Sequence, residues 1–229
     1  MIPPRGTTLP YTRTMMTDQN PAQEGNEPAP LPNSRKALDA LLNQMIEHPE
    51  RHLEIAAEVE AAFGQDRATL IIDMSGFTRT TRTHGIVSFL LMIHQMHRMC
   101  CPSIAAHGGT LGKTEADNLF CLFDSVATAL AAAQDIVHRL TMVNFVLPED
   151  RHLYASIGIG YGRILNIEDH DLFGDEVNLS CKLSEDIASR NAILLTEQAY
   201  VQLTEPSGCL IRQEVSVSGL SLVYYELAN

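Results

Sequence analysis

Two aspartates, each at a predicted turn beside a strand, place the strongest constraint on how this chain folds. Five apolar or β-branched residues precede Asp73 in ATLIIDMSGFT, which predicts a buried strand that ends there. A Ser-Gly pair follows, where the N-terminus of a next helix would offer free amides to a phosphate. Asp117 lies between two strand-like segments, 109–114 and 119–123, which predicts the tip of a hairpin. If the two strands are neighbours, both carboxylates reach one point and suit a metal ion.

Two further motifs follow in order along the chain. SIGIGYGRI occupies 156–164, and DLFGDEVNLSCKL occupies 171–183. Together with the motifs around Asp73 and Asp117, they resemble the catalytic domain of class III nucleotidyl cyclases, of the bacterial adenylate cyclase type. The resemblance covers about 68–227. It implies that 156–164 is the central strand pair of that family and that 171–183 begins its substrate-binding helix.

The predicted elements alternate between strands and helices. After the strand that ends at Asp73 come a helix, a hairpin, a helix, a strand pair, a helix, a strand, a short helix and a final strand pair. The helices are predicted at about 87–99, 125–140 and 175–189, and the single strand at 193–196. This order predicts an α+β fold, a ferredoxin-like split βαβ arrangement with a central, mostly antiparallel sheet. The cyclase resemblance implies the same fold.

The first third of the chain has a different character. Residues 1–32 contain seven prolines among polar residues, which predicts a disordered tail, and either Met1 or Met16 can be the natural start. Apolar residues at helical spacing in 34–47 and again in 50–63 predict two helices. We therefore expect three parts: the tail, a helical extension and a catalytic domain. They span 1–32, 33–64 and 66–229.

Composition excludes several classes of protein. No apolar stretch approaches the ~20 residues of a membrane span, and the N-terminus has no secretory signal pattern, so we expect a cytoplasmic protein that does not bind membranes. The formal net charge of −12 disfavours nucleic acid as a partner, because that needs a basic face. Five cysteines without a CxxC pair indicate free thiols rather than disulfides or zinc ligands.

The resemblance implies a metal site. In the family, two aspartates hold two Mg²⁺ or Mn²⁺ ions, and Asp73 and Asp117 match them. The backbone carbonyl of Met74 would be a further ligand. Backbone amides would hold phosphate oxygens, namely those of Gly76, Phe77 and Thr78. Taken singly, Asp73 could instead be a helix cap and Asp117 a turn residue.

The resemblance also implies a nucleotide pocket. Adenylyl cyclases read adenine with a lysine and an aspartate, matched here by Lys113 and Asp171, whereas guanylyl cyclases have Glu at the lysine position. Asn178 matches the asparagine that orients the ribose. The family arginine that stabilises the α-phosphate in the transition state corresponds to Lys182. Lys113 and Asp171 could also be ordinary surface charges, Asp171 within the acidic run at 168–171.

The resemblance implies an adenylate cyclase that converts ATP to 3′,5′-cyclic AMP and pyrophosphate as a homodimer, because family active sites take residues from both protomers. Two departures leave alternatives open. Lys182 lacks the planar fork of arginine, and Ser218 stands where the family has a phosphate-binding lysine. One alternative is a degenerate cyclase domain that binds nucleotide as a regulatory module. Another is a cyclase for GTP or a pyrimidine triphosphate.

Overall fold

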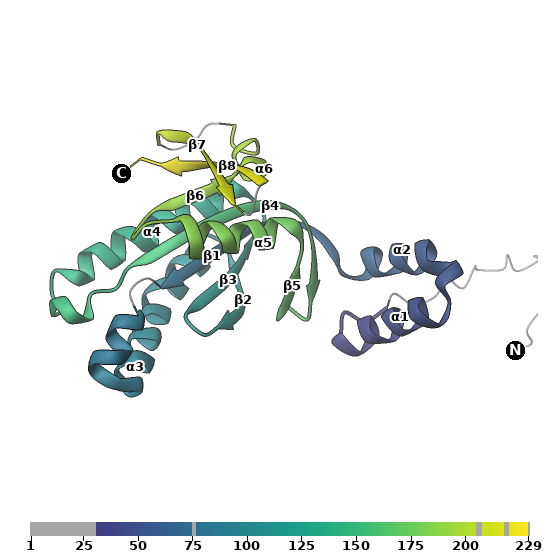
Figure 1. Ribbon diagram of the computed structural model, residues 1–229, viewed down its shortest axis with the longest axis horizontal. Coiled ribbons are helices and arrows are strands. Elements are labelled where there is room, and N and C mark those ends of the chain that lie inside the picture. Colours follow the sequence, from purple (N-terminus) through teal and green to yellow (C-terminus); the bar gives the residue numbers. More distant parts are fainter. Residues whose placement is uncertain (1–30, 75–76, 205–207, 218–219, 229) are drawn as a thin grey trace, which may run out of the picture. The chain divides into compact units, whose positions relative to one another are not determined.

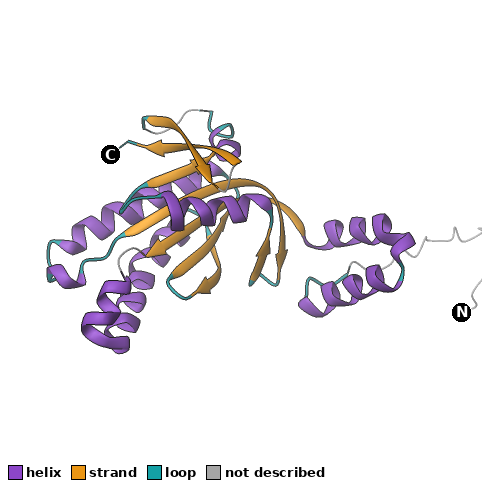
Figure 2. Cartoon of the chain, in the orientation of Figure 1, coloured by secondary structure: helices purple, strands orange, loops and turns teal. Residues whose placement is uncertain are grey.

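The computed structural model describes residues 31–74, 77–204, 208–217 and 220–228. Over these ranges the centre of the fold is one eight-stranded sheet, drawn as arrows in Figures 1 and 2. Seven strands lie in the order β2-β3-β1-β4-β6-β8-β7, and β5 pairs with β4. The strands are β1 (Gly64–Met74), β2 (Thr110–Glu115), β3 (Asn118–Phe123), β4 (Ala155–Ile167), β5 (Asp171–Phe173), β6 (Ile193–Thr196), β7 (Leu210–Val217) and β8 (Leu220–Leu227).

The topology of the first four strands confirms the predicted fold class. They are connected as β1-α3-β2-β3-α4-β4, where α3 is Phe77–Ala106 and α4 is Val126–Asn144, and they lie in the spatial order β2-β3-β1-β4. β1 is antiparallel to both of its neighbours, and β4 and β6 form a parallel pair. This is the ferredoxin-like split βαβ arrangement in a mostly antiparallel sheet.

Alternating side chains of β1 bury against different layers. Leu70 and Ile72 belong to the large core that α3 and α4 form with one face of the sheet. Ile71 points to the other face, where it packs in a cluster with Val177 of α5 (Asp175–Lys182). Figure 1 shows α4 and α5 on opposite sides of the sheet. The continuous apolar run before Asp73 therefore reflects a strand covered on both faces, as the sequence predicts.

Three glycines of β4 allow α5 to pack closely on the sheet. A Cβ on Gly158 would lie 2.1 Å from the carbonyl oxygen of Ser180, and one on Gly160 would lie 2.4 Å from the Ser180 Oγ. A Cβ on Gly162 would lie 2.9 Å from the Cγ of Glu176. The spacing of two residues puts all three glycines on one face of the strand, where the helix approaches the backbone directly.

This arrangement corrects the predicted strand pair at 156–164. The segment lies within the single strand β4, because its glycines serve helix packing and none of them makes a turn. The antiparallel partner at the end of β4 is β5, which pairs Leu165 with Phe173 and Ile167 with Asp171.

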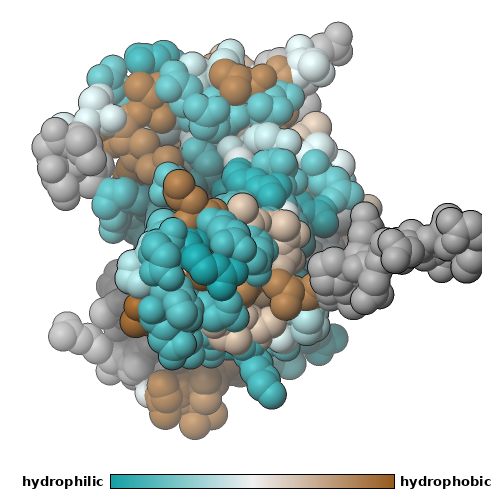
Figure 3. Space-filling view, turned by 90° about the vertical axis from the view of Figure 1, so that its right-hand side faces the viewer, coloured by the Kyte–Doolittle hydropathy of each residue, from teal (hydrophilic) through white to brown (hydrophobic). Residues whose placement is uncertain are grey.

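The helical extension has its own small core. α1 (Arg35–Glu47) begins at Ser34, whose Oγ accepts a hydrogen bond from the amide of Ala37. A 3-10 turn (Pro49–Arg51) leads to α2 (His52–Phe63), which runs directly into β1. Buried residues of both helices pack with Ile167 of β4, and they are Leu38, Leu41, Ile55, Val59 and Phe63. Figure 3 views the molecule from the side of these helices and shows a largely hydrophilic face with separate hydrophobic areas.

The remaining elements agree with the prediction in type and differ in length. α3 is longer than the predicted 87–99, and it is broken at Gly85, which has φ 79° and ψ 172°. The predicted helix 175–189 is α5 followed by a π-helical turn, η3 (Leu183–Ile187). A 3-10 turn (Glu149–Arg151) precedes β4, and α6 (Glu197–Tyr200) follows β6. In the described ranges, no helix combines the length and apolar character that a membrane crossing needs.

Candidate active site

The two aspartates meet at one end of β1. Asp73 is the penultimate residue of that strand and lies opposite Asn118 of β3. Asp117 directly precedes Asn118, in the two-residue turn that joins β2 to β3. Pairing of β1 with β3 therefore brings the two carboxylates together, although 44 positions separate them in the sequence.

The Asp73 carboxylate is half-buried in an acidic setting. Burial, then the Asp117 carboxylate and then the Glu185 carboxylate raise the pKa of Asp73 to about 6. At neutral pH the site thus holds neighbouring negative charges, and no ion pair with a described arginine or lysine compensates Asp73. Carboxylate oxygens with excess negative charge are suitable donors for Mg²⁺ or Mn²⁺. No group of three His, Cys, Asp or Glu side chains in the described ranges is already arranged as a metal cage.

Glu185 is a residue of this region that sequence reasoning missed. It lies in η3, and its Oε1 accepts a hydrogen bond of 2.6 Å from the Nδ2 of Asn118. This contact ties the turn after α5 to the hairpin that carries Asp117. The sequence signal was weak, because Glu185 is one of two adjacent acids near a helix end.

The β2–β3 turn uses an unusual residue. Ala116 has φ 51°, in the left-handed region that glycine adopts without a steric penalty. For alanine this conformation costs about 1 kcal/mol. The turn next to Asp117 is therefore held in its conformation by the surrounding strands rather than by its own preference.

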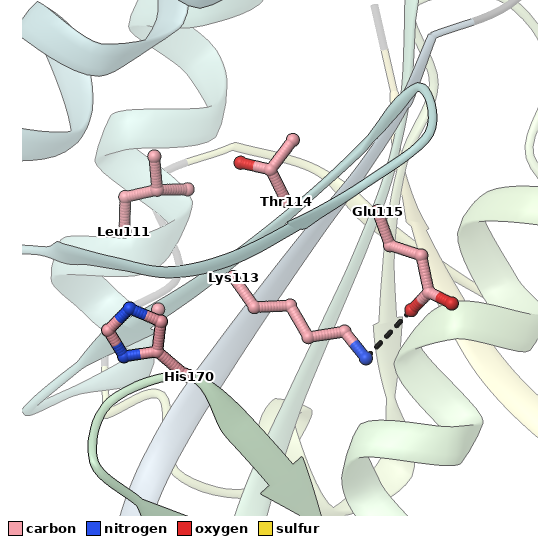
Figure 4. A pocket seen from close by; sticks show the side chains of 6 residues that line it. Leu111, Lys113, Thr114, Glu115 and His170 are labelled. Atoms are coloured by element: carbon pink, nitrogen blue, oxygen red, sulfur yellow. Dashed lines mark ion pairs between the residues drawn. The ribbon is translucent and has the colours of Figure 1, made fainter.

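A cavity of about 490 Å³ lies beside Lys113 of β2. Its lining residues are Leu111, Gly112, Lys113, Thr114, Glu115 and His170, and Figure 4 shows His170 reaching toward β2 from the β4–β5 loop. The Lys113 Nζ lies 2.7 Å from the Oε2 of Glu115 and 4.9 Å from the centre of the Phe120 ring. Lys113, the lysine predicted to read a nucleobase, thus lines a cavity, but its ammonium group is paired with the Glu115 carboxylate.

Asp171 is close to this cavity in the fold but is not among its lining residues. It begins β5, directly after His170, and its Oδ2 lies 3.2 Å from the Nη1 of Arg35 in α1. The structure therefore brings Lys113 and the hairpin of Asp171 together, whereas the Asp171 carboxylate pairs with the helical extension.

Asn178 and Lys182 lie one turn apart on α5, as predicted. Asn178 is exposed, and the Lys182 Nζ lies 3.3 Å from the Oδ2 of Asp186. No hydrogen bond or ion pair connects either residue with Asp73 or Asp117, all four of which lie in described segments. Of the predicted phosphate-binding residues, Phe77 and Thr78 fall in the first turn of α3, whereas Gly76 lies outside the described residues.

Comparison with known proteins supports the resemblance to nucleotidyl cyclases. A putative adenylate cyclase 3 of Rhizobium meliloti is 27% identical over 130 residues, which are 57% of this chain and 22% of that protein. An adenylate cyclase of Streptomyces coelicolor is 30% identical over 123 residues, 54% of this chain and 30% of that protein. The crystal structure of an adenylate/guanylate cyclase/hydrolase from Silicibacter pomeroyi superposes with a TM-score of 0.60, at 24% identity, over 72% of this chain and 98% of that one. No protein-family model matches the chain.

The fold of this chain is that of adenylyl and guanylyl cyclase catalytic domains, and both of these curated relatives are named adenylate cyclases. The chain spans less than a third of the length of each of these two curated relatives. Ser218, which is predicted to stand where the family has a lysine, lies outside the described residues.

The fold also contains a buried acid that sequence reasoning missed. Glu176 of α5 is 9% exposed and accepts hydrogen bonds from the amide of Tyr161, at 3.1 Å, and from the Oγ1 of Thr196, at 2.6 Å. Burial raises the pKa of Glu176, and the two hydrogen bonds oppose that shift. Glu176 thus joins α5 to both β4 and β6, and this anchors the helix that carries Asn178 and Lys182.

Proposed function

We propose that this protein is an adenylate cyclase that converts ATP to 3′,5′-cyclic AMP and pyrophosphate at a site with two Mg²⁺ or Mn²⁺ ions. The observation that carries the proposal is the meeting of Asp73 and Asp117 at the end of β1, in a domain with the class III cyclase fold. The curated relatives named adenylate cyclase favour ATP, whereas the name of the solved neighbour includes both adenylate and guanylate.

The reaction needs the ribose 3′ oxygen to attack the α-phosphorus while pyrophosphate leaves. Bound divalent ions would lower the pKa of the 3′ hydroxyl and neutralise phosphate charge. Asp73 and Asp117 would hold these ions, with the backbone carbonyl of Met74 as a further ligand. The amides of Phe77 and Thr78, at the start of α3, would bind phosphate oxygens together with the amide of Gly76.

The other assigned residues act on the nucleoside and on the reacting phosphate. Lys113 would donate a hydrogen bond to adenine N1, and Asp171 would accept one from the N6 amino group. Asn178 would orient the ribose. Lys182 would face the α-phosphate as a point charge, without the two parallel hydrogen bonds of an arginine.

We further propose a homodimer with shared active sites. Among the described residues, no hydrogen bond or ion pair joins Asp73 or Asp117 to Asn178 or Lys182 within one chain, which fits sites that take one pair from each protomer. A mixing experiment tests this arrangement. Asp73→Ala and Asn178→Ala chains, each inactive alone, should regain about a quarter of the wild-type activity when mixed in equal amounts, because half of the dimers then hold one complete site. A mixture as inactive as its components would exclude the shared site.

The substrate is tested by incubating the purified protein with Mn²⁺ and each of the four nucleoside triphosphates, and by identifying the products by mass. We expect cyclic AMP and pyrophosphate from ATP, and loss of both in the Asp73→Ala and Asp117→Ala chains. A cyclic product from GTP or a pyrimidine triphosphate in preference to ATP would overturn the assignment of the base. If none of the triphosphates gives a cyclic product, the proposed cyclase activity is refuted.

A second candidate is a degenerate cyclase domain that binds nucleotide as a regulatory module. The ion pair of Lys182 with Asp186 favours this candidate, because the Asp186 carboxylate engages the ammonium group that would otherwise stabilise the transition state. Such a module would bind ATP without forming cyclic AMP, so the same incubation combined with a binding measurement distinguishes the two functions.

A further inference from the structure

An ion pair connects the helical extension to the β4–β5 hairpin, beside the cavity that Lys113 lines. Arg35 is the first residue of α1, and its Nη1 lies 3.2 Å from the Oδ2 of Asp171, the first residue of β5. The same guanidinium lies 3.0 Å from the Oδ1 of Asp39 through its Nε. Asp39 is one helical turn further along α1, so it holds the Arg35 guanidinium from its own helix.

Further contacts attach the start of α1 to the hairpin between β4 and β5. The Asn33 Nδ2 donates to the carbonyl oxygen of Asn166 at 3.1 Å, and the amide of Glu168 donates to the Asn33 Oδ1 at 3.0 Å. The amide of Arg35 donates to the Glu168 Oε2 at 3.3 Å. These bonds surround Ile167, which is buried in the core of the helical extension. Arg35 is therefore held beside Asp171 by the backbone on both sides of the contact.

The pair competes with the proposed role of Asp171. An acceptor for the adenine N6 amino group must present its carboxylate to the cavity beside Lys113, and Asp171 is absent from the residues that line it. His170, the preceding residue, does line it. His170 is the last residue of the β4–β5 turn and Asp171 is the first residue of β5, so in this one hairpin conformation His170 lines the cavity while Asp171 pairs with Arg35.

We propose that Arg35 is an inhibitory positioning residue that holds Asp171 away from the nucleobase, so that the N-terminal extension controls affinity for ATP. The inference rests on the proposed function, because it takes Asp171 as a reader of adenine. A segment that moved the start of α1 would release the carboxylate without touching the metal site.

The size of the effect follows from the exposure of the pair. The side chains of Arg35 and Asp171 are 52% and 42% exposed. Exposed ion pairs contribute at most about 1 kcal/mol, which corresponds to about fivefold in affinity. We therefore expect Arg35→Gln to lower the KM for ATP up to about fivefold, with kcat unchanged, and to leave the KM for GTP unaltered.

A double-mutant cycle tests the proposal. Arg35→Gln, Asp171→Asn and the double variant are compared for KM and kcat with ATP, and for the Kd of a non-hydrolysable ATP analogue by calorimetry. We expect Arg35→Gln to tighten binding in the wild-type background and to have no effect in the Asp171→Asn background. Arg35→Lys should keep most of the wild-type affinity. Arg51→Gln is the matched control, because Arg51 forms an exposed ion pair with Glu54 in the same extension and should change nothing.

Several outcomes would overturn the inference. They are weaker binding of ATP by Arg35→Gln, an equal effect of Arg35→Gln in both backgrounds, and a parallel loss of kcat and thermal stability. The calorimetric cycle separates this inference from the proposed function. If ATP-analogue binding shows the expected coupling between positions 35 and 171 but no cyclic product forms, only the proposed catalytic function is refuted. If cyclic AMP forms normally without that coupling, only the role of Arg35 is refuted.

Discussion

Replacing Asp73 with asparagine should stabilise the metal-free protein at alkaline pH. In the folded chain, burial and the carboxylates of Asp117 and Glu185 raise the pKa of Asp73 from 3.8 to about 6. Above pH 6 the carboxylate is ionised in both states and the folded state carries the unfavourable charge. Below about pH 4 it is protonated in both states and the penalty is absent. Between these values the folded chain binds more protons, so the free energy of unfolding falls as the pH rises.

The magnitude follows from the shift. One pKa unit corresponds to about 1.4 kcal/mol, so the full shift would amount to about 3 kcal/mol. Partial exposure of the site to solvent reduces this figure, and we expect about 1–2 kcal/mol. Asp73→Asn should therefore raise the free energy of unfolding by that amount at pH 8, and by little at pH 4.

The assay is urea denaturation at pH 4 and pH 8 in the presence of EDTA. Asp66→Asn is the matched control, because Asp66 is an exposed residue of the same strand and should not reproduce the gain. Added Mn²⁺ should stabilise the wild type at pH 8 and not the Asp73→Asn variant. An equal gain at both pH values, or a less stable variant at pH 8, would refute the argument that repulsion between carboxylates dominates at this site.

Three further predictions concern catalysis, nucleotide affinity and packing. Lys182→Arg should raise kcat several-fold with little change in KM, because a guanidinium can make two parallel hydrogen bonds to an oxyanion, and unchanged steady-state kinetics would contradict this. Glu115→Gln should lower the KM for ATP at constant kcat, because it removes the carboxylate that pairs with Lys113 at 2.7 Å and so leaves the lysine available to the base. A raised KM would show that Glu115 itself helps bind the base. Gly160→Val should destabilise the fold by about 2–3 kcal/mol, measured as a lower Tm, because a Cβ there meets the Ser180 Oγ at 2.4 Å. A wild-type Tm would contradict the close packing of α5 on β4.

Local patterns in the sequence were sufficient for most of the fold. The run before Asp73 identified β1, the helical spacing after Ser34 identified α1, and the segments around Asp117 identified the β2–β3 hairpin. At 156–164 the resemblance implied a strand pair, whereas this segment lies within the single strand β4, and its alternate glycines lie under α5. Their true role depends on α5, which follows later in the chain, so the pattern of β4 alone did not contain it.

The candidate site was predictable only in part, for a related reason. The positions of Asp73 and Asp117 follow from strand pairing, which the apolar pattern encodes. The contact of Glu185 with Asn118 and the Arg35–Asp171 pair depend on side chains far apart in the sequence, and charged residues at a surface show no periodicity that would reveal such partners. Gly76 and Ser218 lie outside the described residues and remain predictions from the sequence.

The glycines of β4 bear on how the exposed side of α5 could be redesigned. Because α5 rests on bare backbone at Gly158 and Gly160, the depth of the helix depends on the absence of side chains beneath it. Residues on its outer side, such as Asn178 and Lys182, can then be exchanged without lifting the helix from the sheet. The chemistry at this surface can therefore vary while the scaffold below it stays constant.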